Sequence, residues 1–347
     1  MKALVLDSCK HMSYTEVERP EIRKPDEVLI SIKASAICGS DIHGYDGSTG
    51  RRQPPVIMGH EASGVVVAAG EHVESVKTGD WVTFDSTISC GACEYCKSGR
   101  VNLCDSRRVV GVSCDEYRMD GTFAEYIVVP ERIIYKIPEG VSFVEAALTE
   151  PASVAAHAVN ITPIRLNESI AVVGSGLIGL LIIQIARTMT SGPVIAIDPD
   201  PSRRESALAF GADASFDPNE EGYQKRINET FGISGIDRVF EAVGVTSAIK
   251  GALTVVKKGG SLTLVGNISP FIELPLQSVV TREITLYGSC AISGEYPAVL
   301  SMMQNKTLDV LPLVSVTDSL ENGASWFDIL YHKRQNVLKV VLTPQEA

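Results

Sequence analysis

The spacing of apolar positions divides the chain into two parts. Over residues 1–155, short apolar or alternating runs recur, among them EVLISIKASAI, ASGVVVAAG, DWVTF and AEYIVV, and Gly, Pro and Asp interrupt them at close intervals. A period of two predicts strands that bury one face, and frequent turn residues favour antiparallel connections. We therefore expect an antiparallel barrel or sandwich in this part.

From about residue 155 the pattern changes to strands alternating with helices. The run SIAVVGSGLIGLLIIQIARTM predicts a strand, a glycine turn and a helix, and PVIAIDPD and PSRRESALAFGAD predict the next strand and helix. Further short strands are expected at IDRVFEAVG, SLTLVGN and ITLYGS. This alternation indicates a parallel, doubly wound sheet. The rhythm fades from Ser289, and VLKVVLTP is expected to return to the first domain as a strand.

Length, composition and charge narrow the classes of protein to consider. A chain of 347 residues with 45% hydrophobic and 21% charged residues is typical of a globular protein of two domains. The net charge of −11 argues against a nucleic-acid partner. Residues 177–186, the longest apolar stretch, fall far short of a membrane span, and the N-terminus lacks a signal-peptide pattern. We expect a cytoplasmic protein without membrane partners.

The glycine turn GSGLIG has the spacing of a dinucleotide-binding loop. Gly174 permits the tight turn, Gly176 lets the backbone approach a pyrophosphate, and Gly179 allows close packing of helix on strand. Leu177 and Ile178 open the helix, whose N–H groups face the phosphates. By itself, the motif fits an ordinary strand–helix turn equally well.

An acidic residue after the second strand supports the nucleotide interpretation. Asp198 follows the turn by about 20 residues, where a carboxylate binds the adenosine ribose hydroxyls of NAD. Its charge would repel a 2′-phosphate, so NAD is favoured over NADP. Arg203 and Arg204 follow closely and would instead favour the 2′-phosphate of NADP. We expect Arg203 to flank the adenine pocket.

Two groups of residues have the chemistry of zinc ligands. Cys90, Cys93, Cys96 and Cys104 lie in one loop, and four thiolates suit a closed, tetrahedral, structural Zn²⁺ site. The second group combines a thiolate, an imidazole and carboxylates, a set that suits a catalytic zinc with an open position. Its members are Cys38, His60, Glu61 and Glu150. Sequence spacing alone leaves open whether these four converge.

An ordered series of motifs resembles the zinc-containing medium-chain dehydrogenase/reductase family over essentially the whole chain. The motifs are CGSDIH at 38–43, GHEASGVV at 59–66, CGACEYCKSGRVNLC at 90–104, GTFAEY at 121–126, EPASVAAHA at 150–158 and GSGLIG at 174–179. Within that family the chain is most similar to the sorbitol (polyol) dehydrogenase branch. The resemblance implies a GroES-like β-barrel catalytic domain at 1–157 and 289–347, a Rossmann domain at 158–288, and a homotetramer or homodimer.

The resemblance also implies individual roles. Cys38 and His60 would ligate the catalytic zinc, Glu150 would be its acidic ligand directly or through water, and Glu61 an alternative ligand. Asp41 would orient a ligand from behind. A proton relay would run from the substrate through Ser40 and the nicotinamide ribose to His43, while hydride passes to the nicotinamide. The residues expected to line the cofactor on later strand ends are Val265, Gly266, Asn267, Ser289 and Cys290.

The expected reaction is the oxidation of a secondary hydroxyl of a polyol or sugar-derived alcohol to a ketone. The chain departs from the sorbitol branch at two positions, so the identity of the substrate stays undecided. Gly44 replaces a frequent aromatic substrate contact, and Ala291 replaces a substrate-binding arginine. Both changes are expected to enlarge the space for the substrate. Arg51 and Arg52 are either solvated surface or contacts for an anionic terminus. Alternatives are a threonine dehydrogenase-like enzyme, a sugar-acid or polyol-phosphate dehydrogenase, and a catalytically idle relative that binds NAD or zinc.

Overall fold

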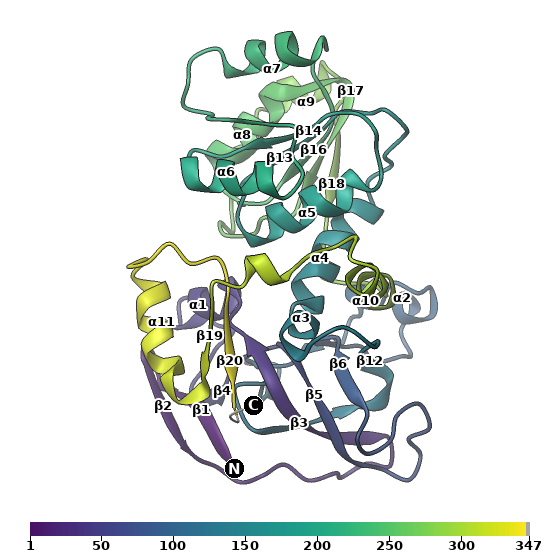
Figure 1. Ribbon diagram of the computed structural model, residues 1–347, viewed down its shortest axis with the longest axis vertical. Helices are drawn as coiled ribbons and strands as arrows, with labels where there is room; N and C mark the ends of the chain where they lie inside the picture. The colour runs from purple at the N-terminus through teal and green to yellow at the C-terminus, as the bar shows by residue number, and fades with distance from the viewer. Residues whose placement is uncertain (345–347) are drawn as a thin grey trace. The chain divides into compact units, whose positions relative to one another are not determined.

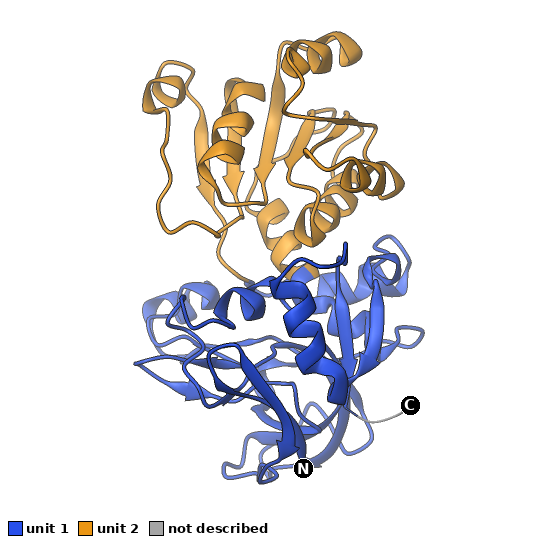
Figure 2. Cartoon of the chain, turned by 90° about the vertical axis from the view of Figure 1, so that its left-hand side faces the viewer, with its two compact units in different colours: residues 1–151, 292–347 blue, residues 152–291 orange. Residues whose placement is uncertain are grey.

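The computed structural model describes residues 1–344 and separates into two compact units. Unit 1 comprises residues 1–151 and 292–347, and unit 2 comprises residues 152–291 (Figure 2). The first boundary falls inside helix α4 (Thr149–Asn160). The units therefore begin and end a few residues from the boundaries expected at 157/158 and 288/289.

Unit 1 is built mainly from antiparallel strands, as the alternating pattern predicts. A seven-stranded sheet has the order β12-β6-β5-β3-β20-β19 with β11 also paired to β3, and a three-stranded sheet has the order β2-β1-β4 (Figure 1). The strands are β1 (Lys2–Ser8), β2 (His11–Glu16), β3 (Glu27–Ala36), β4 (Val56–Ile57), β5 (Glu61–Ala69), β6 (Trp81–Phe84), β7 (Thr87–Ile88), β8 (Arg108–Val109), β9 (Val112–Ser113), β10 (Arg118–Met119), β11 (Tyr126–Pro130), β12 (Ile134–Lys136), β19 (Val316–Ser319) and β20 (Val340–Thr343).

The C-terminal strand β20 joins this sheet as expected. It pairs antiparallel with the end of β3, Val341 opposite Ala36. The helices of this unit are α1 (Gly39–Gly44), α2 (Glu94–Lys97), α3 (Phe143–Ala147), the start of α4, α10 (Tyr296–Gln304) and α11 (Gly323–Tyr331), with 3-10 turns at Val101–Leu103, Glu131–Ile133, Leu311–Leu313 and Leu320–Asn322. Residues near the two ends of the chain thereby share one hydrophobic core.

Unit 2 is a parallel sheet of six strands with helices between them, which confirms the expected α/β class. The order β15-β14-β13-β16-β17-β18 places the first strand of the unit beside its second and fourth. That is the arrangement of doubly wound nucleotide-binding folds. Its elements are β13 (Ile170–Val173), α5 (Leu177–Arg187), β14 (Val194–Ile197), α6 (Pro201–Ala209), β15 (Ala214–Phe216), α7 (Tyr223–Phe231), β16 (Ile236–Glu241), α8 (Thr246–Val255), β17 (Val256–Leu264), α9 (Leu276–Val280) and β18 (Thr285–Gly288).

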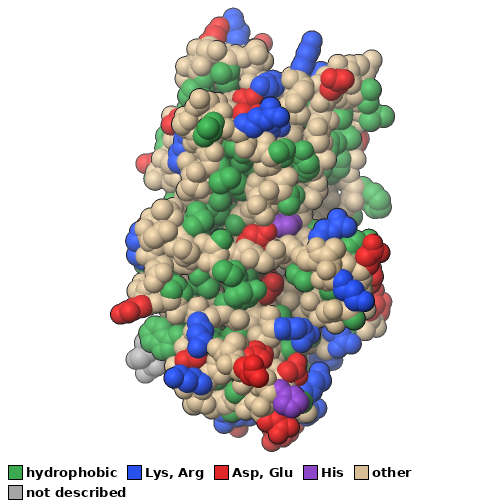
Figure 3. Space-filling view, turned by 90° about the vertical axis from the view of Figure 1, so that its right-hand side faces the viewer, with side chains coloured by type: hydrophobic (Ala, Val, Ile, Leu, Met, Phe, Trp, Pro, Cys, Tyr) green, Lys and Arg blue, Asp and Glu red, His purple; other side chains and the backbone are tan. Residues whose placement is uncertain are grey.

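The surface is charged and mixed. Acidic and basic side chains are interspersed over the face shown in Figure 3. Among residues 1–344, no helix has both the length and the apolar character needed to cross a bilayer.

Candidate functional site

The pairing of β3 with β5 brings the expected ligands of the catalytic metal together. Ala36, at the end of β3, lies opposite Glu61, the first residue of β5. Cys38 follows β3 as the cap of α1, and His60 immediately precedes β5. One ligand atom each from Cys38, His60 and Glu61 lies within 4.8 Å of the other two. The strand register therefore positions a thiol, an imidazole and a carboxylate at one point.

The donor set fits a zinc ion. Glu61 is completely buried, and its Oε1 has no hydrogen-bond partner among the described residues. Burial disfavours the charged form of His60, yet Asp41 and Cys38 raise the pKa of its imidazole well above the usual value. A site whose negative groups favour a positive imidazole also favours a bound cation. Sulfur, nitrogen and oxygen ligands are those that Zn²⁺ takes in open catalytic sites.

Asp41 stands directly behind two of these ligands, as expected for an orienting residue. Its Oδ1 lies 3.4 Å from His60 Nδ1, and its Oδ2 accepts the backbone N–H of Cys38 at 3.2 Å. Burial opposes ionisation of this carboxyl, but His60 and Arg52 lower its pKa well below the usual range. Asp41 is therefore a buried carboxylate that lies beside the imidazole and holds the backbone of Cys38.

The expectation that Arg52 is either solvated or ready to bind an anionic substrate is wrong. Only 4% of Arg52 is exposed, and its Nη2 donates to Asp41 Oδ1 at 3.0 Å. Its charge is already balanced by a buried carboxylate. Its stem also occupies the space above Gly44, where an added Cβ would lie 2.3 Å from Arg52 Cγ, so the glycine does not open a void. Arg51, in contrast, is exposed.

Glu150 lies close to the cluster but is held by a different partner. It is buried at the start of α4, where its Oε1 accepts a hydrogen bond from Ser86 Oγ at 2.9 Å. Burial, reinforced by the Glu61 carboxylate and opposed by His60, raises the pKa of Glu150 to about 7. Of the two carboxylates expected at the metal, Glu61 thus belongs to the compact three-residue cluster, and Glu150 sits within its electrostatic reach.

Lys339 is a site residue that sequence reasoning missed. Its buried Nζ donates to Glu61 Oε2 at 2.6 Å and to the carbonyl of Ile37 at 2.9 Å. Lys339 comes directly before β20, nearly 280 residues from its partner in sequence, and only the pairing of β20 with β3 brings it there. The single available signal was a lysine inside the apolar run VLKVVL.

The expected relay residues occupy α1. Ser40 Oγ lies 3.3 Å from Cys38 Sγ and 3.5 Å from His60 Nε2, so its hydroxyl touches two ligand side chains. His43 is exposed in the last turn of the same helix. The hydroxyl therefore lies at the metal cluster, and the imidazole lies toward solvent.

The four-cysteine loop forms a second cluster. The sulfur atoms of Cys90, Cys93, Cys96 and Cys104 all lie within 4.8 Å of one another. Backbone N–H groups of Ala92 and Cys93 donate to Cys90 Sγ at 3.4 and 3.3 Å, and they lower the pKa of this thiol to about 6. Burial acts in the other direction on Cys104 and raises the pKa of its thiol to about 11. Four sulfur atoms gathered in one loop fit a closed tetrahedral zinc site.

In unit 2, the glycine turn has the geometry that nucleotide binding needs. Gly174 has a φ of +92°, and a Cβ at Gly179 would lie 1.8 Å from the carbonyl oxygen of Gly174. Gly176 caps α5, and a Cβ there would meet open space, which leaves the helix N-terminus accessible. Leu177 and Ile178 form the first turn of that helix. Its N–H groups suit a pyrophosphate.

Asp198 ends β14 beside this turn. Its Oδ2 accepts the backbone N–H of Ser175 at 2.7 Å, and its Oδ1 accepts that of Asp200 at 2.9 Å. Arg204 donates to the carbonyls of Asp198 and Pro199, whereas Arg203 is exposed on α6. Asp198 therefore braces the glycine turn from the position where a ribose hydroxyl is expected.

The other expected cofactor residues follow the neighbouring parallel strands. Val265, Gly266 and Asn267 come directly after β17, and Ser289 and Cys290 directly after β18. A Cβ at Gly266 would lie 2.1 Å from the backbone nitrogen of Gly244, so the two loops are in close contact. The carboxyl ends of parallel strands are where such folds bind nucleotides.

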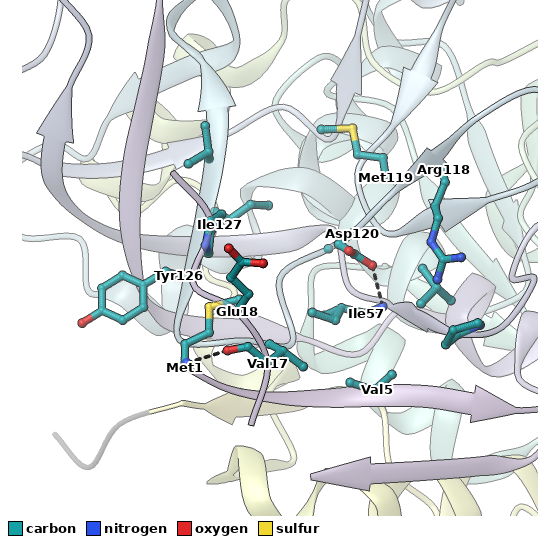
Figure 4. Close-up of a pocket in the computed structure, with 15 residues that line it drawn as sticks. Met1, Val5, Val17, Glu18, Ile57, Arg118, Met119, Asp120, Tyr126 and Ile127 are labelled. Atoms are coloured by element: carbon teal, nitrogen blue, oxygen red, sulfur yellow. Dashed lines mark hydrogen bonds between the residues drawn. The ribbon is translucent and has the colours of Figure 1, made fainter. Parts of the chain in front are cut away.

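A separate groove of about 440 Å³ lies elsewhere on unit 1, lined by residues of the β1, β4 and β11 regions (Figure 4). Two of its polar groups are bonded within the chain: the N-terminal amine donates to the Val17 carbonyl, and Asp120 accepts the N–H of Ile57. None of the metal-site residues lines it. The groove is thus not part of the candidate site.

Comparison with known proteins agrees with this arrangement. Residues 24–139 match the family model of the alcohol dehydrogenase GroES-like domain, and residues 178–305 match that of zinc-binding dehydrogenases. Sorbitol dehydrogenase of Bacillus subtilis is 33% identical over 349 residues, which cover 99% of this chain and 97% of the relative.

Two solved structures share the fold over 99% of both chains at 30% identity. One carries the description of a short chain alcohol dehydrogenase of E. coli CFT073 complexed with NADH, with a TM-score of 0.90. The other, from Sinorhizobium meliloti 1021, carries the description of a zinc-binding dehydrogenase bound to NADP, with a TM-score of 0.89. Together with the two clusters of candidate metal ligands and the glycine turn, these similarities show that the chain belongs to the zinc-containing medium-chain dehydrogenase/reductase family, in its sorbitol dehydrogenase-like branch.

Proposed function

We propose that the protein oxidises a secondary hydroxyl of a polyol or sugar-derived alcohol to a ketone and transfers the hydride to NAD. The observation that carries the proposal is the cluster of Cys38, His60 and Glu61 with the Ser40 hydroxyl against two of its members. Zinc held by these residues would supply a Lewis acid that makes an alcohol proton easier to remove.

The side chains around the metal have distinct tasks in this reaction. Ser40 Oγ is placed to accept the substrate proton as it releases its own hydroxyl proton toward exposed His43 and solvent. Asp41 holds the imidazole of His60, and Lys339 compensates the buried carboxylate of Glu61. Asp41 and Lys339 thus position the groups around the metal, and each buried charge has a partner of opposite sign.

A polyol is favoured over a simple alcohol because of the buried carboxylate of Glu150. Carboxylate oxygens accept hydrogen bonds from neighbouring hydroxyls, and a site with such acceptors leaves them unpaired when a plain alcohol enters. The similarity to sorbitol dehydrogenase of B. subtilis, an enzyme named for a polyol, also supports a polyol substrate. Glu150 Oε1 already accepts from Ser86, so its second oxygen is the one left to bind a substrate hydroxyl.

NAD is preferred to NADP because Asp198 places a carboxylate at the ribose position. Arg203 and Arg204, which favour a 2′-phosphate in principle, are respectively exposed and engaged with main-chain carbonyls. Reduction of NAD is therefore the expected signal of turnover.

The deciding experiment compares substrates by kcat/KM at fixed NAD, followed by NADH absorbance. The panel contains xylitol, sorbitol, a hexonate, a polyol phosphate, threonine and ethanol. We expect a polyol or aldonate to exceed ethanol by at least about 10²-fold, as for sites that hydrogen-bond a substrate hydroxyl. Efficient turnover of ethanol alone contradicts the polyol assignment; turnover of threonine alone favours the threonine dehydrogenase-like alternative; and failure of every substrate favours the idle relative.

The protein is also proposed to act in the cytoplasm as a homodimer or homotetramer. Thiols such as those of the four-cysteine cluster keep their metal in a reducing compartment.

Self-association is supported by β18, which lies at the edge of its sheet, and by the exposed apolar residues in the segment leading into it: Ile268, Phe271, Leu276 and Val280. An unpaired strand edge beside apolar side chains suits a two-fold contact between copies.

A further inference from the structure

Arg52 lies buried behind the metal cluster, in the loop between α1 and β4. Its Nε and Nη2 lie 3.3 and 3.0 Å from Asp41 Oδ1. Its Nη1 donates to the Arg51 carbonyl at 3.1 Å, and its Nη2 also lies 3.5 Å from Ser40 Oγ. The guanidinium is therefore fixed by several contacts and faces both an acid and a hydroxyl of the site.

The contacts form a continuous path from Arg52 to the metal ligands. The oxygen of Asp41 that binds Arg52 is also the one that faces His60 Nδ1, at 3.4 Å. The other oxygen of Asp41 accepts the Cys38 N–H. A carboxylate that is completely buried needs a cation beside it, because an unpaired buried charge is costly. Arg52 supplies that cation and fixes the direction of the shared oxygen.

Gly44 is the steric condition for this arrangement. A Cβ at position 44 would lie 2.3 Å from Arg52 Cγ and 3.1 Å from Arg52 Cβ. The colliding atoms belong to the stem of Arg52 near the backbone, which cannot move aside as a flexible tip would. A larger residue at 44 therefore displaces the whole arginine side chain.

We propose that Arg52 is a positioning residue of the catalytic metal site and that glycine at position 44 is what admits it. Its guanidinium holds Asp41 against His60 and Cys38 and faces the Ser40 hydroxyl. The proposal rests on the proposed function for its effect on turnover, but its effect on metal binding can be measured independently. Arg52 touches neither the metal cluster's ligand atoms nor substrate in this assignment.

The first test is Arg52→Met, which keeps an unbranched stem and removes the charged fork. Zinc affinity of the cysteine–histidine–glutamate site is expected to fall by about 10- to 100-fold, as for other partners behind metal ligands. Zinc content after dialysis against graded chelator should fall from about two per chain to about one, because the four-cysteine site is untouched. Circular dichroism and thermal melting report whether the fold survives.

Two variants make this measurement specific. Arg51→Met changes an exposed arginine on the same loop and should keep both zinc ions. Arg52→Lys keeps the charge but not the fork, so it should recover part of the lost affinity. A general loosening of the structure would release zinc from both clusters and would not be rescued by lysine.

The pairing with Gly44 is tested by a double-mutant cycle. The cycle uses Arg52→Ala, because alanine lacks the Cγ that a Cβ at position 44 would meet at 2.3 Å. Gly44→Ala should lower zinc affinity in the same direction as Arg52→Ala, and the double variant should be no worse than Arg52→Ala alone. Additive losses would show that the two positions act independently and would overturn the pairing. If Arg52→Met does not fold, Gly44→Ala and Arg52→Lys carry the same comparison.

The two proposals fail in different ways. Full retention of both zinc ions and of kcat/KM in Arg52→Met overturns the positioning role and leaves the proposed function intact. Absence of turnover on the whole substrate panel by the unmodified enzyme overturns the proposed function, while the zinc titration of the variants still decides the role of Arg52.

Discussion

At the scale of single residues, the metal site depends on buried charges that compensate one another. Glu61 and Lys339 have side chains 1% and 2% exposed, and Asp41 and Arg52 are similarly enclosed. Removing one member of a buried pair leaves the other uncompensated, which costs more than the pair itself contributes. These residues therefore tolerate paired changes better than single ones.

Lys339→Met should reveal this dependence. With Glu61 left buried beside a missing cation, we expect a loss of about 3–5 kcal/mol in the free energy of unfolding, measured by urea denaturation. Adding Glu61→Gln to the same chain removes the orphaned charge and should recover most of that loss. Lys2→Met is the matched control, because Lys2 pairs with Glu16 at the exposed surface. A stable single variant would mean that another group neutralises Glu61.

The two cysteine clusters should respond differently to serine. The Cys38→Ser variant is expected to lose turnover, to keep its fold and to bind one zinc ion per chain, against about two in the parent. Cys93→Ser is expected to lower the melting temperature, because a closed metal site contributes to folding. Zinc analysis with thermal melting of both variants checks this division, and equal loss of fold in the two would contradict it.

At the scale of elements, strand ends and loops decide where polar groups lie. The register of β3 against β5 assembles the candidate metal ligands, and the parallel order of β14, β13, β16, β17 and β18 brings the residues proposed to bind the cofactor to one edge. Short connections at these ends enclose carboxyl groups. Whether such a carboxyl group is ionised, and what it hydrogen-bonds to, then depends on its position at the strand end.

Asp198 at the end of β14 should control the choice of cofactor. Asp198→Asn keeps an acceptor for the N–H of Ser175 but removes the charge that opposes a 2′-phosphate. Binding of NADH should weaken and that of NADPH should strengthen relative to it, as measured by titration of nicotinamide fluorescence. An unmodified protein that already binds NADPH more tightly than NADH would disprove the role given to Asp198.

Asp85, between β6 and β7, should make stability depend on pH. Burial, opposed by hydrogen bonds from Thr87, raises the pKa of this carboxyl to about 6 from 3.8. The folded state then holds its proton over a range where the unfolded state releases it, so this group's contribution is lost as pH rises from about 4 to about 6.

Asp85→Asn keeps an acceptor for the Thr87 N–H and removes the titration. Relative to the parent, it should be more stable above pH 6, by an amount on the order of 3 kcal/mol at most. The difference should shrink toward pH 4. Melting temperatures of both proteins across this range give the comparison, and a difference independent of pH would assign the effect to packing.

At the scale of the whole molecule, the chain leaves its second unit, then returns to the first with β19 and β20, so the core of unit 1 contains both early and late segments. Unit 2 ends in an unpaired edge at β18. The segment before that edge exposes several apolar side chains, with Phe271 89% exposed. An assembly of copies would cover them.

Phe271→Glu combined with Leu276→Glu should therefore reduce the oligomeric state, since two charges in an apolar contact oppose association. Light scattering coupled to size-exclusion chromatography measures the mass of each form. Leu166→Glu, at a residue 84% exposed elsewhere on the same unit, is the control and should leave the mass unchanged. A parent that is already a monomer would contradict the proposed assembly.

The sequence by itself determined the division into a strand-rich part and a part of alternating strands and helices. It also determined the glycine turn, the four-cysteine loop and the types of the candidate metal ligands. Each is a local pattern: glycines at fixed spacing, thiols within one loop, or apolar residues at a period of two or of a helix turn. Local patterns are visible in one dimension because the residues that create them are neighbours.

Only the tertiary structure decided which distant residues share the candidate metal site. It joined Lys339 to Glu61 through the pairing of β20 with β3, and it buried Arg52 against Asp41 over Gly44. The sequence showed two arginines in a polar loop and a glycine in place of an aromatic residue, with nothing to connect them. Their relation depends on strand register and on the space that one missing Cβ leaves, and neither is encoded at short range.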